Sequence, residues 1–424
     1  MKKIIFIWLT VICVSVIAVA NELQTGPETL EDKYPLYRNL ELLADVITIV
    51  QKSYVKEVSA HDLIHGAIRG VVNTLDAHSQ FLEPDEYHDM KIETEGEFGG
   101  LGIEITLKDG FLTVVTPLED TPAYQAGIKP EDRIIKIDGT STEDITLNEA
   151  VKKLRGEPGT KVILTIMRKD KKEFLDFTIE RSFIKLASIK DAQVIDNDIC
   201  YIRIVQFQEN TLPDTKKAIE KLAPQCQSGI ILDLRNNPGG LLQSAVDIAS
   251  LFIAAPHLIV STKGRLPDQN QEFISTEENT LTDLPLVIIL NKGSASGSEI
   301  VAGAIKDWHR GILIGTQSFG KGSVQSVLPL RDGSALKLTT ATYFTPRGTN
   351  INKIGIKPDI EIPISEEEEK ALWEATAKRK KDNGDIDLKL DPQLQRAIDL
   401  LKGLYVFKET TADETANSEP VTAL

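Results

Sequence analysis

The sequence predicts a multidomain α/β protein, and three observations support this fold class. Residues 30–93 carry apolar side chains at helical spacing. Residues 95–183 place short apolar strands around a glycine-rich loop. Residues 184–364 alternate short apolar strands with helices, which is typical of a layered α/β core. At 424 residues the chain is long enough for two or three domains.

Composition narrows the possible partners and cofactors. Hydrophobic residues make up 41% and charged residues 26%, as in an ordinary globular protein. The formal net charge is −15 and no basic patch dominates, which argues against a nucleic-acid partner. No cluster of cysteine and histidine has metal-ligand spacing, so we expect no metal and no other cofactor.

The first 20 residues resemble a signal peptide. Lys2 and Lys3 precede an almost wholly apolar run from Ile4 to Val19, and an Ala-Val-Ala cleavage site ends at Ala20. The alternative is an uncleaved anchor, but about 16 apolar residues are short for a membrane span. We therefore expect residues 1–20 to direct export to the periplasm or cell envelope, with retention at the inner membrane still possible.

Residues 30–93 form the predicted N-terminal helical region. His61 and His65 are four residues apart, as two metal ligands on one helix would be. No carboxylate completes a zinc-protease pattern nearby, so solvated helix histidines are the favoured interpretation.

Residues 95–183 have the features of a peptide-binding module. Its candidate binding residues are Gly99, Gly100, Leu101, Gly102 and Ile103. Glycines leave backbone N–H groups free to bind a terminal carboxylate, and the strand that follows offers an edge to an extended peptide. Residues 147–154 supply the helix that would line the groove.

Residues 184–364 contain the predicted α/β core. The expected strands and helices follow: strands at 194–195, 199–204, 230–234 and 286–290, and helices at 214–222, 241–253 and 298–308. Cys200 and Cys226 fall in different elements, and the sequence leaves open whether they form a disulfide or remain two buried thiols. Residues 365–407 are predicted to be helical, and the small polar residues 408–424 are predicted to be disordered.

Two glycine-rich loops in this core carry a candidate nucleophile and a candidate base. Ser296 lies in the loop 293–299, between an apolar strand and a helix, where a nucleophile is exposed at a tight corner. Lys321 lies between two glycines in the loop 318–325. A free serine hydroxyl needs a base, and a lysine can act as one when burial lowers its pKa.

Each candidate has a less specific alternative. Ser296 could be only the N-cap of the following helix. Lys321 could be only a surface cation. His309 is a rival base, but it lies near the far end of the helix that starts at Ser296, roughly 15–20 Å away.

Several motifs together resemble the carboxyl-terminal processing peptidases, PDZ-containing serine proteases of the bacterial envelope and of chloroplasts. They are Gly-Ser-Ala-Ser-Gly-Ser-Glu at 293–299, Ser-Phe-Gly-Lys-Gly-Ser-Val-Gln at 318–325, Asp-Leu-Arg-Asn-Asn-Pro-Gly-Gly at 233–240, and Leu-Thr-Thr-Ala-Thr-Tyr at 338–343. The resemblance implies a PDZ domain at 95–183 and a core related to crotonase and Clp protease at 184–364.

The resemblance also implies roles for individual residues. The family's catalytic serine and lysine are 25 positions apart, which selects Ser296 for Lys321 over Ser294 and Ser298. Gln325, four residues after the lysine, would orient its amine. The backbone N–H of Gly297 would be one oxyanion donor, and Gly239 or Gly240 would supply the other.

The implied function is an exported endopeptidase that recognises free protein C-termini, cleaves through an acyl-enzyme, and processes or degrades envelope proteins. In relatives the helical region supports dimerisation and the PDZ domain can cover the active site; a homodimer and an adaptor protein are possible partners. The alternative is a non-catalytic PDZ scaffold or chaperone. A crotonase-like acyl-CoA enzyme is disfavoured by the export signal and the PDZ segment.

Overall fold

The computed structural model describes residues 30–118, 121–169, 171–278, 280–382 and 386–417. The predicted signal peptide, residues 1–20, lies outside the described residues, as does the end of the predicted tail, 418–424. The chain divides into two compact units, Met1–Phe81 and Leu82–Leu424, which are described separately below.

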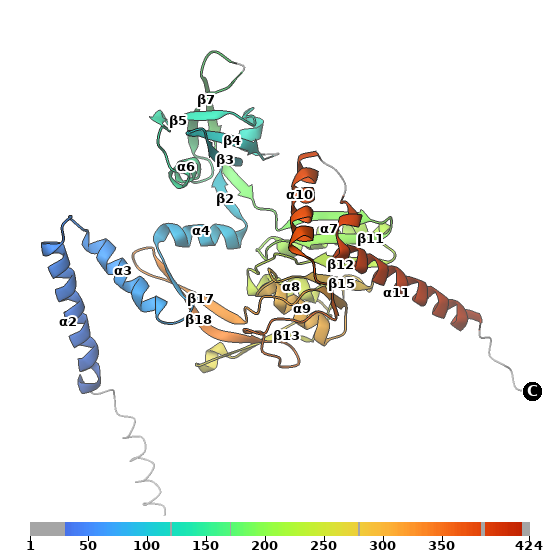
Figure 1. Cartoon of the computed structure of the whole chain (residues 1–424). Coiled ribbons are helices and arrows are strands. Elements are labelled where there is room, and N and C mark those ends of the chain that lie inside the picture. Colours follow the sequence, from blue (N-terminus) through green and yellow to red (C-terminus); the bar gives the residue numbers. More distant parts are fainter. Residues whose placement is uncertain (1–29, 119–120, 170, 279, 383–385, 418–424) are drawn as a thin grey trace, which may run out of the picture. The chain divides into compact units, whose positions relative to one another are not determined.

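The first unit is helical, as the sequence predicts. It contains α2 (Leu30–Ser53) and α3 (Ala60–Asn73), and the short strand β1 (Gln80–Leu82) begins at its end (Figure 1). Ser59 is the N-cap of α3, and its hydroxyl accepts the N–H of Asp62 at 3.1 Å. This cap satisfies one of the helix's free N–H groups and fixes where α3 begins.

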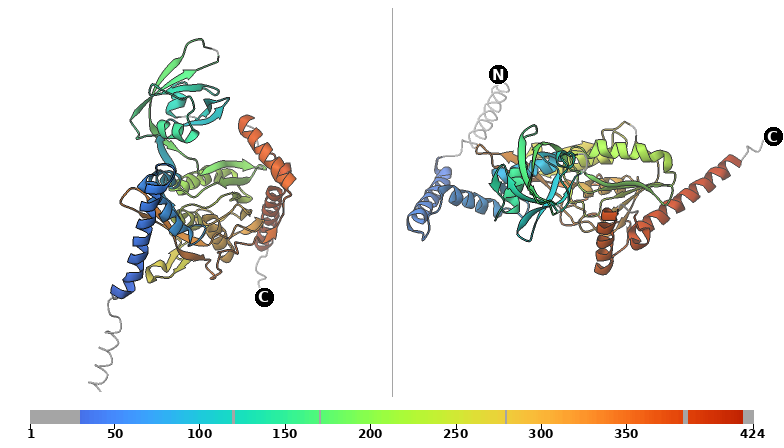
Figure 2. Two further views of the ribbon diagram at one scale, coloured as in Figure 1. Left: turned by 60° about the vertical axis from the view of Figure 1, so that its left-hand side comes forward. Right: turned by 90° about the horizontal axis from the view of Figure 1, so that it is seen from above.

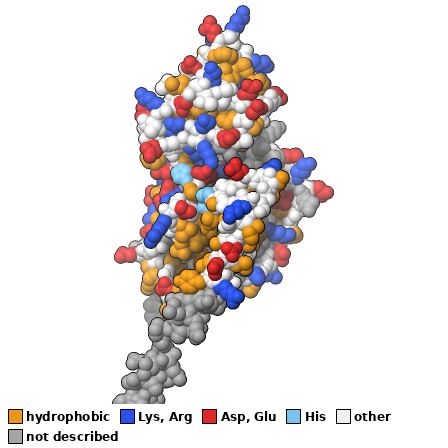
Figure 3. All heavy atoms as spheres, turned by 90° about the vertical axis from the view of Figure 1, so that its left-hand side faces the viewer, with side chains coloured by type: hydrophobic (Ala, Val, Ile, Leu, Met, Phe, Trp, Pro, Cys, Tyr) orange, Lys and Arg blue, Asp and Glu red, His pale blue; other side chains and the backbone are white. Residues whose placement is uncertain are grey.

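The helix α2 leaves a row of large apolar side chains in solvent. These exposed side chains include Leu36, Leu40, Leu43, Val46 and Ile49. Figure 3 shows hydrophobic side chains gathered on the face of the molecule that carries α2 and α3. An apolar stripe of this kind is typical of a surface that another protein or another copy covers.

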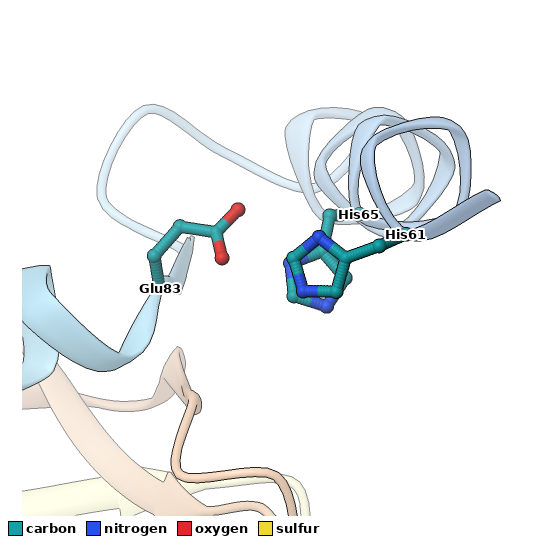
Figure 4. A group of neighbouring side chains, drawn as sticks. All are labelled: His61, His65 and Glu83. Carbon is teal, nitrogen blue, oxygen red and sulfur yellow. The ribbon is translucent and has the colours of Figure 1, made fainter. Parts of the chain in front are cut away.

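His61 and His65 lie on successive turns of α3, as Figure 4 shows. Their ring centroids are 3.8 Å apart. His61 is exposed, but His65 is only 8% exposed, and its ring meets Phe81 edge-on at 5.1 Å. The prediction of two solvated histidines is therefore wrong for His65, which packs against an aromatic ring.

In the second unit, an antiparallel five-strand path and two helices form the PDZ domain. The strand order is β3-β4-β5-β7-β8, with β6 paired to β5. The elements are β3 (Ile103–Lys108), β4 (Phe111–Pro117), α5 (Pro122–Gln125), β5 (Arg133–Ile137), β6 (Thr140–Ser141), α6 (Leu147–Leu154), β7 (Lys161–Met167) and β8 (Leu175–Glu180). Apolar side chains that alternate along β7, Val162, Leu164 and Ile166, are fully buried in its core. Because β3 is an edge strand, one side of it is open to a further strand.

The PDZ domain is an insertion that leaves and re-enters the chain through a two-stranded ribbon. The helix α4 (Pro84–Glu95) precedes β2 (Glu97–Gly100), which pairs antiparallel with β9 (Ser182–Lys185). The α4 helix ends at Gly96, which has a left-handed backbone with φ of 75°.

The α/β core is built on a six-stranded sheet with the order β10-β11-β12-β15-β16-β19. Its strands are β10 (Ile189–Ile195), β11 (Ile199–Ile204), β12 (Gly229–Asp233), β15 (Leu286–Leu290), β16 (Ile312–Gly315) and β19 (Ile360–Glu361). Only β10 runs antiparallel to its neighbour; the others are parallel. The helices α7 (Thr211–Leu222), α8 (Leu242–Ser250) and α9 (Gly297–Asp307) connect the parallel strands. The strands and helices predicted from the sequence all appear here.

Both faces of the middle of this sheet are covered, which explains why the central strand β15 is apolar at every position. Ile230 and Leu232 of β12 face the core that includes α8 and α9. Ile231, between them, faces Leu394 and Ile398 of α11 (Pro392–Asn417). Figures 1 and 2 show α11 beginning beside the sheet. The helix continues to Asn417, beyond residue 407, where we expected disorder to begin.

A second sheet was not predicted from the sequence. It includes β17 (Ser323–Pro329), β18 (Ala335–Phe344), β13 (Leu258–Gly264) and β14 (Gln271–Ile274), paired in that order. The remaining elements are α10 (Glu366–Asp382) and the short 3-10 helices at Ala223–Gln225, Pro267–Gln269 and Leu388–Leu390. The long β17–β18 pairing matters because β17 follows the Lys321 loop directly.

Cys200 and Cys226 form a disulfide with an S–S distance of 1.99 Å, which resolves the question that the sequence left open. It joins β11 to the segment that precedes β12. Among the described residues, no helix combines the length and the apolar character that a membrane span requires.

Candidate active site

Ser296 lies at the turn between β15 and α9. Its backbone has φ of 52° and ψ of −111°, a conformation that L-residues other than glycine rarely adopt. Such strain at a strand–turn–helix corner is typical of a nucleophile held at the surface of an α/β sheet. Ser296 is 7% exposed.

The hydroxyls of the two neighbouring serines already have structural hydrogen bonds. Ser294 Oγ donates to the carbonyl of Leu234 at 2.8 Å. Ser298 Oγ donates to the carbonyl of Asn237 at 2.9 Å. Both side chains are fully buried and hold this turn against the loop that follows β12. This geometry favours Ser296 as the reactive serine.

Lys321 lies in an irregular segment between β16 and β17 and is half-buried. Glycines let this segment run close to the chain at 352–355: a Cβ on Gly322 would lie 2.1 Å from the backbone nitrogen of Asn352. Phe319, two residues before Lys321, is 63% exposed, so its ring is not what buries the lysine.

The amine of Lys321 has a lowered pKa. Burial is the largest cause, and the positive charge of Lys337 lowers the pKa further, whereas Glu299 opposes the change. Among the described residues, no hydrogen bond or ion pair involves Lys321 Nζ. An amine without a paired carboxylate has little to stabilise its charged form, which is what a general base at neutral pH requires.

A buried glutamate joins the two loops. Glu299 is on the first turn of α9 and is fully buried. One of its oxygens accepts the N–H of Ser296 at 2.8 Å and the N–H of Lys321 at 2.9 Å. The other accepts the N–H of Gly320 at 2.7 Å and the hydroxyl of Ser318 at 2.6 Å. Burial raises the pKa of Glu299, and these four donors act in the opposite direction.

Gln325 is the third residue that the resemblance selects. It lies on β17, and its amide nitrogen donates to Ser323 Oγ at 2.8 Å. The same nitrogen lies 3.5 Å from Thr339 Oγ1 on β18. Both contacts use the amide nitrogen, and among the described residues no hydrogen bond to the amide oxygen is found.

The loop after β12 distinguishes between the two expected oxyanion donors. The N–H of Gly239 donates to Asn237 Oδ1 at 2.9 Å, so it is already used. Among the described residues, nothing accepts a hydrogen bond from the N–H of Gly240 or Gly297. The loop passes close to the serine, because a Cβ on Gly239 would lie 2.7 Å from Ser296 Cβ.

His309, the rival base, lies at the other end of α9. The helix has 11 residues, which corresponds to roughly 16 Å at 1.5 Å per residue. The Nε2 atom of His309 lies 2.5 Å from an Nη2 atom of Arg347. Both residues line a surface pocket with Lys306 and Asp359, away from the turn at Ser296.

The expected peptide-binding residues of the PDZ domain fall into two groups. Gly99 and Gly100 pair with Phe183 and Ser182 in the β2–β9 ribbon. The other three follow at the start of β3. Among the described residues, nothing accepts a hydrogen bond from the N–H of Leu101 or Gly102, so both are free for a carboxylate. The side chain of Leu101 is 3% exposed and belongs to the domain core.

The role of Glu299 was not predicted from the sequence, although a local signal for it is present. Ser296 and Glu299 have the spacing of a capping box, in which the side chain at the third helical position accepts the N–H of the capping residue. The same carboxylate also binds the Lys321 loop, which is far away in the sequence, and no local pattern could indicate that second contact.

Comparisons with known proteins agree with this architecture. The model of peptidase family S41 matches residues 198–362, a PDZ domain model matches residues 113–168, and the activating protease CtpB N-terminal domain matches residues 10–85. A carboxy-terminal-processing protease of Bartonella bacilliformis is 39% identical over 95% of this chain and 96% of its own length. The carboxy-terminal processing protease CtpB of Bacillus subtilis is 35% identical over 79% of this chain and 70% of its own.

Solved structures are also similar. A photosystem II D1 C-terminal processing protease is 28% identical, with a TM-score of 0.44, over 76% of this chain and 92% of its own. The identity to the Bartonella protein over nearly the full length of both chains is decisive. The chain belongs to the carboxy-terminal processing proteases of peptidase family S41.

Proposed function

We propose that the chain is an exported endopeptidase that cleaves proteins near their C-termini with Ser296 as nucleophile and Lys321 as general base. The observation that carries this proposal is the hydrogen bonding of both residues' N–H groups to one oxygen of Glu299. It brings the strained serine and the segment of the half-buried lysine together, although they are 25 positions apart in the sequence.

The chemistry follows from these groups. The neutral amine of Lys321 takes the proton of Ser296 Oγ as the oxygen attacks the scissile carbonyl carbon. The N–H groups of Gly240 and Gly297 donate to the oxyanion that forms. When the C–N bond breaks, the ammonium of Lys321 returns the proton to the leaving amine. Water, deprotonated by the same lysine, then hydrolyses the acyl-enzyme and releases Ser296.

Gln325 acts on the lysine in this scheme. Its amide oxygen accepts a hydrogen bond from the amine and directs the nitrogen lone pair towards the serine. A neutral acceptor does this without restoring the charge of the lysine, which a carboxylate would favour.

The test compares the rate at which a loosely folded protein is cleaved by the mature wild-type chain and by the variants Ser296→Ala and Lys321→Ala. Both variants should lose proteolysis while keeping their thermal unfolding transition, and Gln325→Ala should lose less. Lys353→Ala is a matched control, because its side chain is exposed and has no role in the scheme, although its backbone N–H donates to the carbonyl of Gly320 beside Lys321. Full activity in Lys321→Ala would reject the base assignment.

The same experiment addresses the alternative of a non-catalytic PDZ scaffold or chaperone. A scaffold would bind peptides equally well in the wild type and in Ser296→Ala, with cleavage in neither. We expect no cofactor, so a chelator should leave the rate unchanged. Inhibition by the chelator would instead indicate a metal.

We also propose that the PDZ domain selects substrates with a free C-terminus. The free N–H groups of Leu101 and Gly102 would bind the carboxylate, and the peptide would pair with the open edge of β3. A peptide with an apolar free C-terminus should be cleaved faster than the same peptide when amidated or ending in Asp. Equal rates for all three, unchanged by deletion of residues 95–183, would exclude this role.

Export and assembly are part of the same proposal. The signal-like residues 1–20 would direct the chain to the periplasm or cell envelope. The exposed apolar row on α2 supports a homodimer through the N-terminal helices, with an adaptor protein as a further possible partner. Size measurement of the mature chain, with Leu40→Glu and Ile49→Glu as disrupting variants, tests the dimer.

A further inference from the structure

The loop that carries Gly240, the proposed oxyanion donor, begins at Arg235, whose guanidinium pairs with two buried carboxylates. Arg235 follows β12 and is 12% exposed, and Asp233 at the end of the strand is fully buried. The carboxylate of Asp233 accepts hydrogen bonds from the backbone N–H, Nε and Nη2 of Arg235, at 2.9, 3.0 and 2.7 Å. The hydroxyl of Tyr201 on β11 is a fourth donor to Asp233, at 2.8 Å.

The other side of the guanidinium is held by the C-terminal segment of the chain. Arg235 Nη1 donates to Asp391 Oδ1 at 3.0 Å, and Nη2 lies 2.7 Å from Asp391 Oδ2. This is a two-point arginine–carboxylate pair, which fixes direction as well as distance. Gln393 Oε1 accepts from Nη1 at 3.2 Å, and its amide donates to the carbonyl of Ile362 at 2.8 Å.

Asp391 is itself immobilised. Its Oδ1 accepts the N–H of Leu394 at 3.0 Å, so the residue caps the start of α11. The first turns of α11 then bury Leu394, Ala397, Ile398 and Leu401 against the central sheet. The carboxylate that holds Arg235 is therefore anchored by a helix start and by a hydrophobic core.

From Arg235 the chain passes directly into the active-site loop. Asn236 has φ of 57°, and its N–H donates to Asn291 Oδ1 at 2.9 Å. Asn237 donates its amide to the carbonyl of Ile204 at 3.0 Å and accepts the N–H of Gly239 at 2.9 Å. Gly239 then passes beside Ser296, where a Cβ would lie 2.7 Å from Ser296 Cβ, and Gly240 follows it directly.

We propose that Asp391 and Gln393 are positioning residues for the oxyanion site, acting through Arg235 on the loop Asn236–Gly240. The start of α11 would then help to position the active site, in addition to packing against the central sheet. This inference rests on the proposed role of Gly240 as an oxyanion donor. Arg203 and Tyr201 are the other polar groups near the pair, and both lie on β11.

The test compares kcat and KM of the full mature chain with Asp391→Asn, Asp391→Ala and Gln393→Leu, on one peptide. An oxyanion donor acts on the transition state, so kcat should fall with little change in KM. We expect a loss of about tenfold to a hundredfold in kcat for Asp391→Ala, less than the removal of a whole donor produces. Asp391→Asn and Gln393→Leu should lose less.

A matched control separates positioning from stability. Lys402→Met breaks a different ion pair of α11, with Asp196, and leaves Arg235 untouched. At a temperature well below every unfolding midpoint, it should keep the wild-type kcat. A second readout is the double variant Arg235→Gln/Asp391→Asn, which should be no slower than Arg235→Gln alone if both act through one contact.

The inference is overturned if folded Asp391→Asn and Gln393→Leu keep the wild-type kcat, or if the control loses as much activity as they do. Additive losses in the double variant would also reject it. If Asp391→Ala does not fold, Gln393→Leu decides the question, since it removes two hydrogen bonds, one of them from Arg235, and no charge. Failure of the proposed function is separately visible as activity in Ser296→Ala.

Discussion

The N–H groups of Ser296 and Lys321 donate to the same carboxylate oxygen of Glu299, at 2.8 and 2.9 Å. The candidate nucleophile and candidate base are thus held by one buried carboxylate, and a backbone hydrogen bond from the N–H of Phe319 to the carbonyl of Ser294 at 3.0 Å also joins the two loops. The arrangement makes Glu299 a positioning residue, and its two oxygens have four donors in all.

We expect Glu299→Gln to lower both activity and stability. A glutamine offers one acceptor oxygen where the carboxylate offers two, so at least one buried donor loses its partner, at a cost of about 1–3 kcal/mol. The measurement is the unfolding midpoint together with kcat. Glu272→Gln is the control, because Glu272 is exposed on β14. Wild-type kcat in Glu299→Gln would show that the loops do not depend on the anion.

Much of this fold could be predicted from the sequence because its signals are local. The strand Leu286–Leu290 is a short apolar run before a Gly/Ser turn, and Ser296 follows it at the helix start. The contacts of Glu299 and Asp391 could not be predicted, because each joins segments that are distant in the sequence. The strands β13 and β18 were missed because each mixes polar with apolar residues and neither is a continuous apolar run like β15.

The rate of cleavage should rise with pH through the lowered pKa of Lys321, because only its neutral amine can accept the proton of the serine. Burial is the main cause of this lowering, and Lys337 contributes. Lys337→Met should therefore raise the pKa of Lys321 and shift the rising limb of kcat/KM to higher pH. Lys221→Met removes an exposed charge on α7 and should leave the profile in place. An unshifted profile in Lys337→Met would mean that the two amines do not interact.

Lys321→Met should abolish cleavage and yet stabilise the fold. In the folded chain the lysine binds a proton less readily than in the unfolded chain, so its charge opposes folding below the lowered pKa. This cost disappears as pH rises from the lowered value to the ordinary value of 10.5. The unfolding midpoint of Lys321→Met should exceed that of the wild type by roughly 1–3 °C at neutral pH, and by less at pH 10. A lower midpoint at neutral pH would show that the amine has a stabilising partner.

Gly239→Ala tests how closely the loop must approach Ser296. Gly239 has φ of 105°, and a Cβ there would lie 2.7 Å from Ser296 Cβ and 2.9 Å from the nitrogen of Gly297. The methyl group would push the loop away from the serine and misplace Gly240, so kcat should fall by roughly 10²–10³, as when an oxyanion donor is removed. Gly348→Ala is the matched control: its φ is 82°, but a Cβ there meets nothing within 4 Å. Alanine is strained by the positive φ in both variants, so the two differ only in the crowding of the new methyl group against Ser296 in Gly239→Ala. An equal loss of kcat in the two would trace the effect to backbone strain and not to the position of the oxyanion donor.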